Sequence, residues 1–371
     1  MFMRKICSWA RILLDLSLTP FLPVKVDASL RSRRSTRGKE MPINNTFCKL
    51  LAAVAVSSAL AGTAQATVFS GDLYYTYYSG PPNNVDKIGF SYDDTTHVAS
   101  LGVPTPIAST PGADGIIFAP NGHLLVGGQG SGSVYEVTTG GSTLASQPTG
   151  APSYHLTLDP NNLTVYTSDF GGALKKLSLP IGSGVVTTPI TGDETGVTQV
   201  AFGTGGAVFY VQGSPNGFGN LGTIDLGTGA TSRLYSAVQP AHGLIYDPFT
   251  GLMTMFGRGE TGTMSAVNGL GLLTSAEVYG VSDFDQGAVD GFGHALVAGS
   301  NAITFIDYSV SHDITHPNYV ANFFGFDFID DVAPLVGPGS NPNPTPEPAS
   351  LALLGLGLAG LAGSRGRKSA R

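Results

Sequence analysis

The chain has 371 residues, of which 51 are glycine, 24 are proline and only 12% are charged, so many tight turns are expected. Between Thr67 and Pro344 there are 5 Lys and Arg residues against 22 Asp and Glu residues, a net charge of −17. An anionic body of this kind repels phosphate backbones, which argues against nucleic-acid binding. Both cysteines, Cys7 and Cys48, precede this span, which excludes disulfides and thiol chemistry within it.

The N-terminal region predicts export. Lys49 precedes an apolar run, Leu50–Ala61, and the segment then ends in Ala-Gln-Ala. A positive residue, a short apolar core and an Ala-x-Ala ending are typical of a secretory signal peptide, cut here after Ala66. We therefore predict that residues 41–66 are a signal peptide and that Met41 is the true start. Residues 1–40 would then be upstream sequence that is included because the start codon is assigned too early. An unusually long signal peptide is the alternative.

A repeat of two apolar runs joined by a turn fills residues 67–336. Its clearest copy, Asp114–Gly128, reads DGIIFAPNGHLLVGG, and later copies start near residues 151, 195, 239 and 284. Each copy is followed by two more strand-like runs. Four strands at a period of about 40 to 45 residues are typical of a β-propeller blade. No Trp-Asp dipeptide ends a strand, which excludes a WD40 propeller.

The two ends of the repeat region predict how the ring closes. Gly71–Ser79 matches the second run of a unit and Asp86–Ser91 matches the third, but no first run precedes them. The missing strand is found at the far end, in Phe326–Val332 (FDFIDDV). We predict an all-β, six-bladed propeller in which this strand completes the N-terminal blade and removes a sheet edge. Seven blades are the alternative if Ser309–Phe326 contains further strands.

The C-terminal region differs in composition from the repeats. A linker rich in Pro, Gly and Asn spans residues 337–348 and ends in Pro346, Glu347 and Pro348. Residues 349–371 then form a predicted apolar helix, with an apolar run at residues 349–363, followed by a basic end.

This order of parts resembles the PEP-CTERM sorting signal of Gram-negative bacteria. The resemblance implies export through the secretory translocon, transient contact of residues 349–363 with the inner membrane, and cleavage by an exosortase-type protease. It also implies delivery to the periplasm, the outer surface or the extracellular matrix, where such proteins are associated with exopolysaccharide and biofilm. An ordinary C-terminal membrane anchor is the alternative. The blade motif itself is similar to SMP-30/lactonase-like and NHL-like propellers.

Polar residues recur at one end of the predicted inner strands, at the mouth of the channel. Aligning the units on their turns places six candidate binding residues there: Asp114, His155, Gln199, His242, Asp285 and Asp327. Tyr154, Thr198 and Gln286 are adjacent to them. Calcium would suit the oxygen atoms of this set and a transition metal would suit its histidines. The alternative is that these residues hydrogen-bond channel water, with no cofactor. The metal lactonases use a ring of acidic and amide side chains, and this mixture departs from it.

The remaining histidines are predicted to lie away from this mouth. His123 and His294 follow the turn at the other end of the strands, so we interpret them as solvated turn residues. His312 and His316 belong to a predicted surface loop.

Two functions follow from these patterns. The first is a non-enzymatic surface protein that binds a partner or a glycan of the extracellular matrix. The second is a metal-dependent lactonase-, hydrolase- or lyase-like enzyme acting at the channel mouth. Neither a GxSxG nor an HExxH motif is present, so no catalytic residue is assigned.

Overall fold

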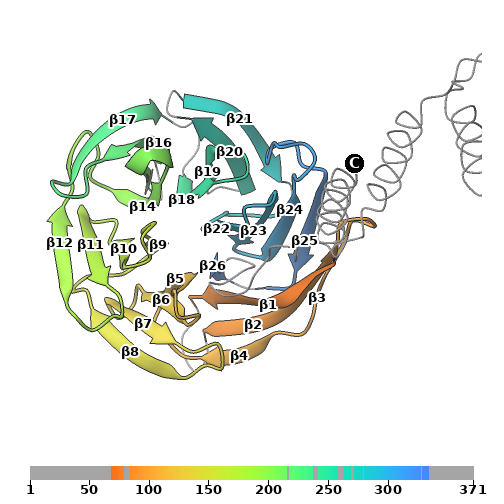
Figure 1. The fold of residues 1–371 in the computed structure, drawn as a ribbon, viewed down its shortest axis with the longest axis horizontal. Helices are drawn as coiled ribbons and strands as arrows, with labels where there is room; N and C mark the ends of the chain where they lie inside the picture. The colour runs from red at the N-terminus through yellow and green to blue at the C-terminus, as the bar shows by residue number, and fades with distance from the viewer. Residues whose placement is uncertain are drawn as a thin grey trace, which may run out of the picture. The chain divides into compact units, whose positions relative to one another are not determined.

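A computed structural model describes residues 68–78, 84–214, 217–236, 241–257, 262–268, 271–278, 280–326 and 328–333. All of them belong to one compact unit, Ala66–Glu347. The described residues form six antiparallel β-sheets arranged as the blades of a ring, as predicted (Figure 1). The predicted signal peptide, the linker and the predicted C-terminal helix lie outside them. In the described part of the chain, no helix has the length and apolarity needed to cross a membrane.

Blades 2 and 3 each contain four strands in sequence order, with the first strand innermost. Blade 2 consists of β5 (Ala113–Phe118), β6 (Leu124–Gly128), β7 (Ser133–Val137) and β8 (Thr143–Pro148). Blade 3 consists of β9 (Leu156–Leu158), β10 (Thr164–Ser168), β11 (Ala173–Ser178) and β12 (Val185–Pro189).

Blades 4 to 6 repeat this order. Blade 4 consists of β14 (Val197–Phe202), β15 (Val208–Ser214), β16 (Gly217–Ile224) and β17 (Ala230–Ser236), with β13 (Thr191–Gly192) parallel to β17 and a short 3₁₀ turn, η1 (Thr204–Gly206). Blade 5 consists of β18 (Ala241–Asp247), β19 (Leu252–Gly257), β20 (Gly262–Asn268) and β21 (Gly271–Val278). Blade 6 consists of β22 (Gly287–Val289), β23 (His294–Gly299), β24 (Ala302–Asp307) and β25 (Tyr319–Phe324).

Blade 1 joins the two ends of the ring. Its strands are β26 (Ile329–Val332), β1 (Val68–Tyr77), β2 (Val85–Asp93), β3 (Val98–Leu101) and, also paired with β2, β4 (Thr105–Ala108). The closing strand β26 pairs antiparallel with β1, placing Val332 opposite Tyr75. The predicted closure is therefore confirmed. Because β25 is simply the fourth strand of blade 6, six blades are confirmed and seven are excluded.

Turn chemistry separates the first and second strands of the repeats. In blade 3, the Asp159 carboxylate accepts hydrogen bonds from the amides of Leu163 and Thr164, at 2.9 and 3.0 Å. In blade 6, the Asp290 carboxylate accepts one from the amide of Phe292, at 2.7 Å. Asp holds such tight turns by bonding the backbone ahead of it. The repeated Asp-containing motifs are thus turns, as their sequence suggests.

The core lies between the blades. Each of six buried apolar clusters in the described residues joins two neighbouring blades, and together they run once round the ring. At the seam, for example, Leu73 and Phe90 of blade 1 pack with Leu296 and Phe305 of blade 6. A four-stranded sheet must cover both of its faces, so each blade depends on both neighbours.

The prediction that His294 is solvated is wrong. Its side chain is buried, and its Nδ1 lies 2.7 Å from a carboxylate oxygen of Asp290. The neighbouring blade supplies Tyr92, whose ring stacks edge-on against it, so the turn is covered. His123 is half-buried and paired with Glu136 at 2.6 Å, whereas His316 is exposed in a loop, as predicted.

Candidate functional site

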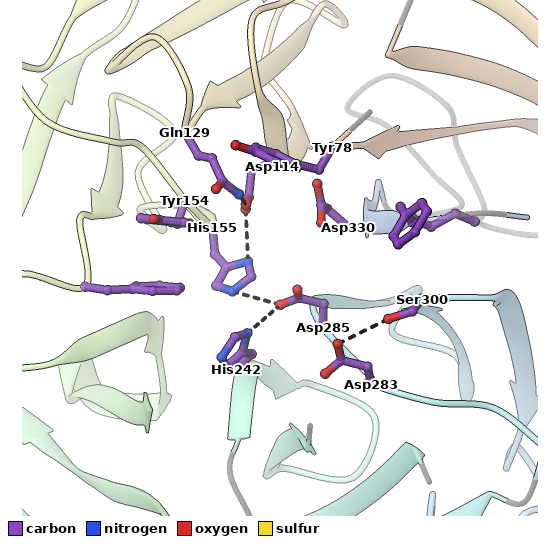
Figure 2. A pocket seen from close by; sticks show the side chains of 13 residues that line it. Tyr78, Asp114, Gln129, Tyr154, His155, His242, Asp283, Asp285, Ser300 and Asp330 are labelled. Carbon is purple, nitrogen blue, oxygen red and sulfur yellow. Dashed lines mark hydrogen bonds and ion pairs between the residues drawn. The ribbon is translucent and has the colours of Figure 1, made fainter. Parts of the chain in front are cut away.

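A pocket of about 370 Å³ lies where the inner strands of blades 1, 2, 3, 5 and 6 meet (Figure 2). Its thirteen lining residues are Tyr78, Asp114, Gln129, Tyr154, His155, Phe170, His242, Asp283, Asp285, Ser300, Phe328, Ile329 and Asp330. None of them is Lys or Arg. Four carboxyl groups, two imidazoles and two phenols therefore provide the ionisable groups of the pocket wall.

His155 is the centre of this arrangement. It directly precedes β9 and is buried. Its Nδ1 lies 3.1 Å from Asp331 and 3.7 Å from Asp114, while its Nε2 lies 3.0 Å from Asp285 (Figure 2 draws the contacts with Asp114 and Asp285). One imidazole thus contacts side chains from three other blades.

Asp285 links His155 to a second imidazole. The same carboxylate oxygen, Oδ1, lies 3.0 Å from His155 Nε2 and 3.3 Å from His242 Nδ1. The His242 ring is buried in β18, against the ring of Phe170 at a centroid distance of 5.5 Å. Asp285 is the most exposed of the three side chains, at 19%. Asp285 is therefore the member of this cluster that a molecule in the pocket can reach most easily.

Asp331 is held rigidly behind His155. It belongs to the closing strand β26 and is fully buried. Its Oδ1 accepts a hydrogen bond from the Gln286 amide at 2.9 Å, and its own amide donates to the Thr76 hydroxyl at 3.2 Å. The strand that closes the ring therefore also fixes the orientation of the central imidazole.

Two glycines allow the blades to approach closely enough for these contacts. Gly115 follows Asp114, and a Cβ placed on it would lie 2.8 Å from the Cα of His155 in the next blade. Gly243 follows His242, and a Cβ placed on it would lie 2.4 Å from the carbonyl oxygen of Asp285. Real side chains do not tolerate such distances, so only glycine fits here. The Asp-Gly and His-Gly pairs thus bring neighbouring blades together at the pocket.

Burial and neighbouring carboxylates raise the pKa values of two carboxyl groups in the pocket. Burial, reinforced by the nearby Asp331 carboxylate, raises the pKa of Asp114 to about 8. Burial, reinforced by Asp114 and Asp285, raises the pKa of Asp330 to about 10. Both groups therefore carry protons at neutral pH.

The contact between His155 and Asp285 behaves as an ion pair. Burial opposes the charge on each, but the carboxylates of Asp331 and Asp285 outweigh it and hold the pKa of His155 well above its usual value. In the same way, His155 and His242 outweigh burial and hold the pKa of Asp285 well below its usual value. The contact therefore favours the charged form of both groups.

Aromatic side chains line the rest of the pocket. Tyr78 and Phe328 are exposed, at 52% and 69%, and the rings of Tyr154 and Phe170 stack at a centroid distance of 3.9 Å. Phe170, Asp283 and Phe328 adopt positive φ angles of 53°, 60° and 57°. Bulky residues rarely adopt this conformation, and such backbone strain gathers at functional sites. The pocket therefore combines a buried polar floor with aromatic walls held in unusual conformations.

The structure brings together most of the residues predicted from sequence. Asp114, His155, His242 and Asp285 all line the pocket, with Tyr154 beside them. Gln199 does not line it, because its side-chain oxygen accepts a hydrogen bond from the Leu244 amide at 2.6 Å, between blades 4 and 5. Thr198 and Gln286 are likewise buried without lining it. Asp327 lies outside the described residues.

Sequence reasoning missed Asp330 and Asp331. Both stand in the segment FDFIDDV, in which Asp327 was chosen as the mouth residue. The closing strand β26 starts only at Ile329, and a one-pair bridge joins Asp331 to Gln286. In a strand of only four residues, the sequence does not show the register, and so it does not show which of the three nearby aspartates reaches the channel. The pair of adjacent aspartates was the available clue.

Comparison with known proteins identifies the tail. A family model described as the PEP-CTERM protein-sorting motif matches residues 344–368, which include Pro346, Glu347 and Pro348. The chain carries a PEP-CTERM sorting signal. The motif implies export, processing by an exosortase, and sorting to a surface or membrane-associated location. It covers only the C-terminal end of the chain, and it assigns no chemistry to the propeller. No curated protein matches the chain significantly.

Solved structures with a similar arrangement include three distant ones. Virginiamycin B lyase from Staphylococcus aureus has a TM-score of 0.44 and 9% identity, covering 70% of this chain and 89% of that one. A streptogramin B lyase has a TM-score of 0.43 and 12% identity, covering 70% and 87%. Kuenenia stuttgartiensis hydrazine synthase has a TM-score of 0.42 and 14% identity, covering 66% and 79%. At these values the likenesses carry no conclusion about activity.

Proposed function

We propose that this protein is a surface-sorted, non-enzymatic propeller that binds a saccharide unit of the extracellular polysaccharide in its pocket. The PEP-CTERM signal supports the location, because its processing by an exosortase goes with export. The observation that carries the binding function is the pairing of exposed aromatic rings with a floor of buried carboxyl and imidazole groups.

This pairing matches the two faces of a pyranose ring. The C–H face of a sugar is apolar and packs against aromatic rings, which bury large apolar areas. Its hydroxyl groups need hydrogen-bond partners, and Asp and Gln side chains supply acceptors and donors. The pocket volume of about 370 Å³ falls within the range of about 300–1,000 Å³ that is common for small-molecule sites.

The charge of the pocket selects among saccharides. Asp114 and Asp330 are protonated at neutral pH, but the lining contains no Lys or Arg and lies within a body of net charge −17. A uronic acid would bring a further carboxylate into this field, which costs free energy. We therefore propose that neutral and amino sugars bind in preference to uronic acids.

The test is the affinity of the purified protein for neutral, amino and uronic oligosaccharides, measured by calorimetry in the presence of a chelator. Phe328→Ala should weaken binding at least about tenfold, or about 1.4 kcal/mol, because it removes an aromatic wall. Phe324→Ala is the matched control, since Phe324 is also exposed, at 56%, but lies on the outer strand β25. Absence of binding by every saccharide, or equal losses in both variants, would refute the proposal.

A metal-dependent hydrolase or lyase is the second candidate function. The observation that favours it is the convergence of His155, His242 and Asp285 on one point of the pocket. Incubation of the protein with the bound oligosaccharide separates the two functions. An enzyme would convert it to shorter or unsaturated products, whereas a binding protein would return it unchanged.

A further inference from the structure

We infer that His155 Nε2, His242 Nδ1 and Asp285 Oδ1 form a binding site for a divalent transition-metal ion, such as zinc, at the floor of the pocket. This inference goes beyond the proposed saccharide binding, since it depends on the positions of these three protein atoms and not on any contact with a sugar. Within the described residues, only two sets of three ligand atoms lie within 4.8 Å of one another, and both include His155.

Two of the separations between the three atoms fit a single metal ion, and all three ligand groups lie within 4.8 Å of one another. Two ligand atoms each about 2.1 Å from one ion are about 3.0 Å apart at a right angle and about 3.4 Å apart at the tetrahedral angle. Asp285 Oδ1 lies 3.0 Å from His155 Nε2 and 3.3 Å from His242 Nδ1. Each imidazole nitrogen is therefore at a distance from Asp285 Oδ1 that shared coordination of one ion requires.

The nitrogen of His155 that faces the pocket is not satisfied by hydrogen bonding. Nε2 is fully buried and, within the part of the chain that the structure describes, has no partner in hydrogen-bonding geometry. The Asp285 carboxylate oxygen lies 3.0 Å away as an ion-pair partner. Buried polar atoms are rarely left in this state, and a metal ion placed between the two atoms would satisfy both.

The surroundings of His155 resemble those of metal-binding imidazoles. Its other nitrogen, Nδ1, lies 3.1 Å from the buried carboxylate of Asp331, which is itself held by the Gln286 amide. Ligating histidines usually donate their second N–H to a carboxylate or carbonyl, which fixes the ring and directs the other nitrogen at the metal. Asp331 is thus a positioning residue for the proposed ligand His155.

Exposure decides between the two candidate sets. Asp114, His155 and Asp331 are all buried, and Asp331 does not line the pocket. His155, His242 and Asp285 all line the pocket. Two imidazoles and one carboxylate leave coordination positions open on the pocket side, and nitrogen-rich sets of this kind favour zinc and related metals over calcium.

The experiment is metal titration of the full-length purified protein, after treatment with a chelator, using zinc for affinity and cobalt(II) for its visible absorption bands. We expect one zinc ion per chain at this site and cobalt bands of a nitrogen- and oxygen-ligated ion. His242→Ala should abolish the bands and weaken zinc binding by more than the about 10- to 100-fold typical of an outer-shell partner. Asp331→Asn should fall within that outer-shell range.

Two controls separate ligand loss from misfolding and from binding elsewhere. Asp285→Asn keeps the shape of the side chain, so it should lose zinc while still unfolding in a single cooperative thermal transition. His316→Ala removes an exposed imidazole that pairs with Asp313 at 2.9 Å, and it should change nothing. Undiminished zinc binding and cobalt bands in both His242→Ala and Asp285→Asn would overturn the inference, as would failure of the unmodified protein to bind either metal.

The outcome is independent of saccharide binding, which is measured with a chelator present. Zinc binding without any saccharide affinity would support the metal site and refute the proposed function. Saccharide affinity without any zinc binding would do the reverse.

Discussion

Asp307 illustrates how one side chain secures the seam of the ring. It lies at the end of β24 in blade 6 and is buried, and it accepts a hydrogen bond from the Tyr92 hydroxyl of blade 1. The amide and hydroxyl of Ser309 donate to its other oxygen, at 2.9 and 2.7 Å. Burial opposes its charge, but these hydrogen bonds and nearby His294 outweigh burial and hold the pKa of Asp307 below its usual value.

Asp307→Asn should therefore make stability less dependent on pH. A carboxyl whose folded pKa is lowered stabilises the protein above its unfolded pKa of about 3.9, and this contribution is lost as pH falls through the folded value. We expect a lower thermal midpoint than the unmodified protein at pH 7 and a smaller difference near pH 3. Unfolding curves at both pH values measure this. A difference that grows on acidification would contradict it.

The residues of the pocket differ in how far the sequence reveals them. Asp114, His155, His242 and Asp285 occupy equivalent places in their repeats, so aligning the turns was enough to predict that they converge. Gln199 has the equivalent position in its repeat, but its side-chain oxygen accepts a hydrogen bond from the Leu244 amide of the next blade. Packing between the blades, which the repeat does not predict, determines this orientation. Phe170 and Phe328 belong to non-repeating segments with positive φ angles, which no repeat pattern predicts.

At the scale of the strand, the approach of one blade to the next determines whether the pocket forms. The first strands of blades 5 and 6 come together at Gly243, where the backbone of Asp285 occupies the space that a side chain would need. Strand positions and turns follow from the repeat, so the sequence predicts them well. The distance between blades depends on side chains of both neighbours and is settled only by packing.

Gly243→Ala should damage both stability and the pocket. A methyl group there would meet the Asp285 carbonyl at 2.4 Å, so the backbone must shift, at a cost of about 1–3 kcal/mol for overpacking. Because Asp285 moves with that backbone, binding in the pocket should weaken too. Gly89→Ala is the control, since Gly89 also lies in a strand but has free space around its Cα. Chemical denaturation measures the stability of both variants, and equal stability in the two would contradict this account.

At the scale of the whole molecule, the propeller and the PEP-CTERM sorting signal have separate roles. Closure by β26 brings Asp331 behind His155, so the strand that joins the ends of the propeller also completes the pocket floor. The sequence predicts this closure because one blade lacks its first strand. It predicts export because the PEP-CTERM motif has a fixed order of parts. Ligand identity depends on side-chain geometry in the pocket, which repeats do not encode.

The central claim, that a saccharide binds among the aromatic walls of the pocket, can be tested with one reporter. The only tryptophan of the chain is Trp9, so a chain of residues 67–344 contains none. Phe328→Trp in that chain then places a single fluorophore at the pocket, and Phe324→Trp places one on the outer strand β25. Titration with neutral or amino oligosaccharides should shift the emission of the first variant saturably and leave the second unchanged. No change in either variant at saturating saccharide, or the same change in both, would contradict the account.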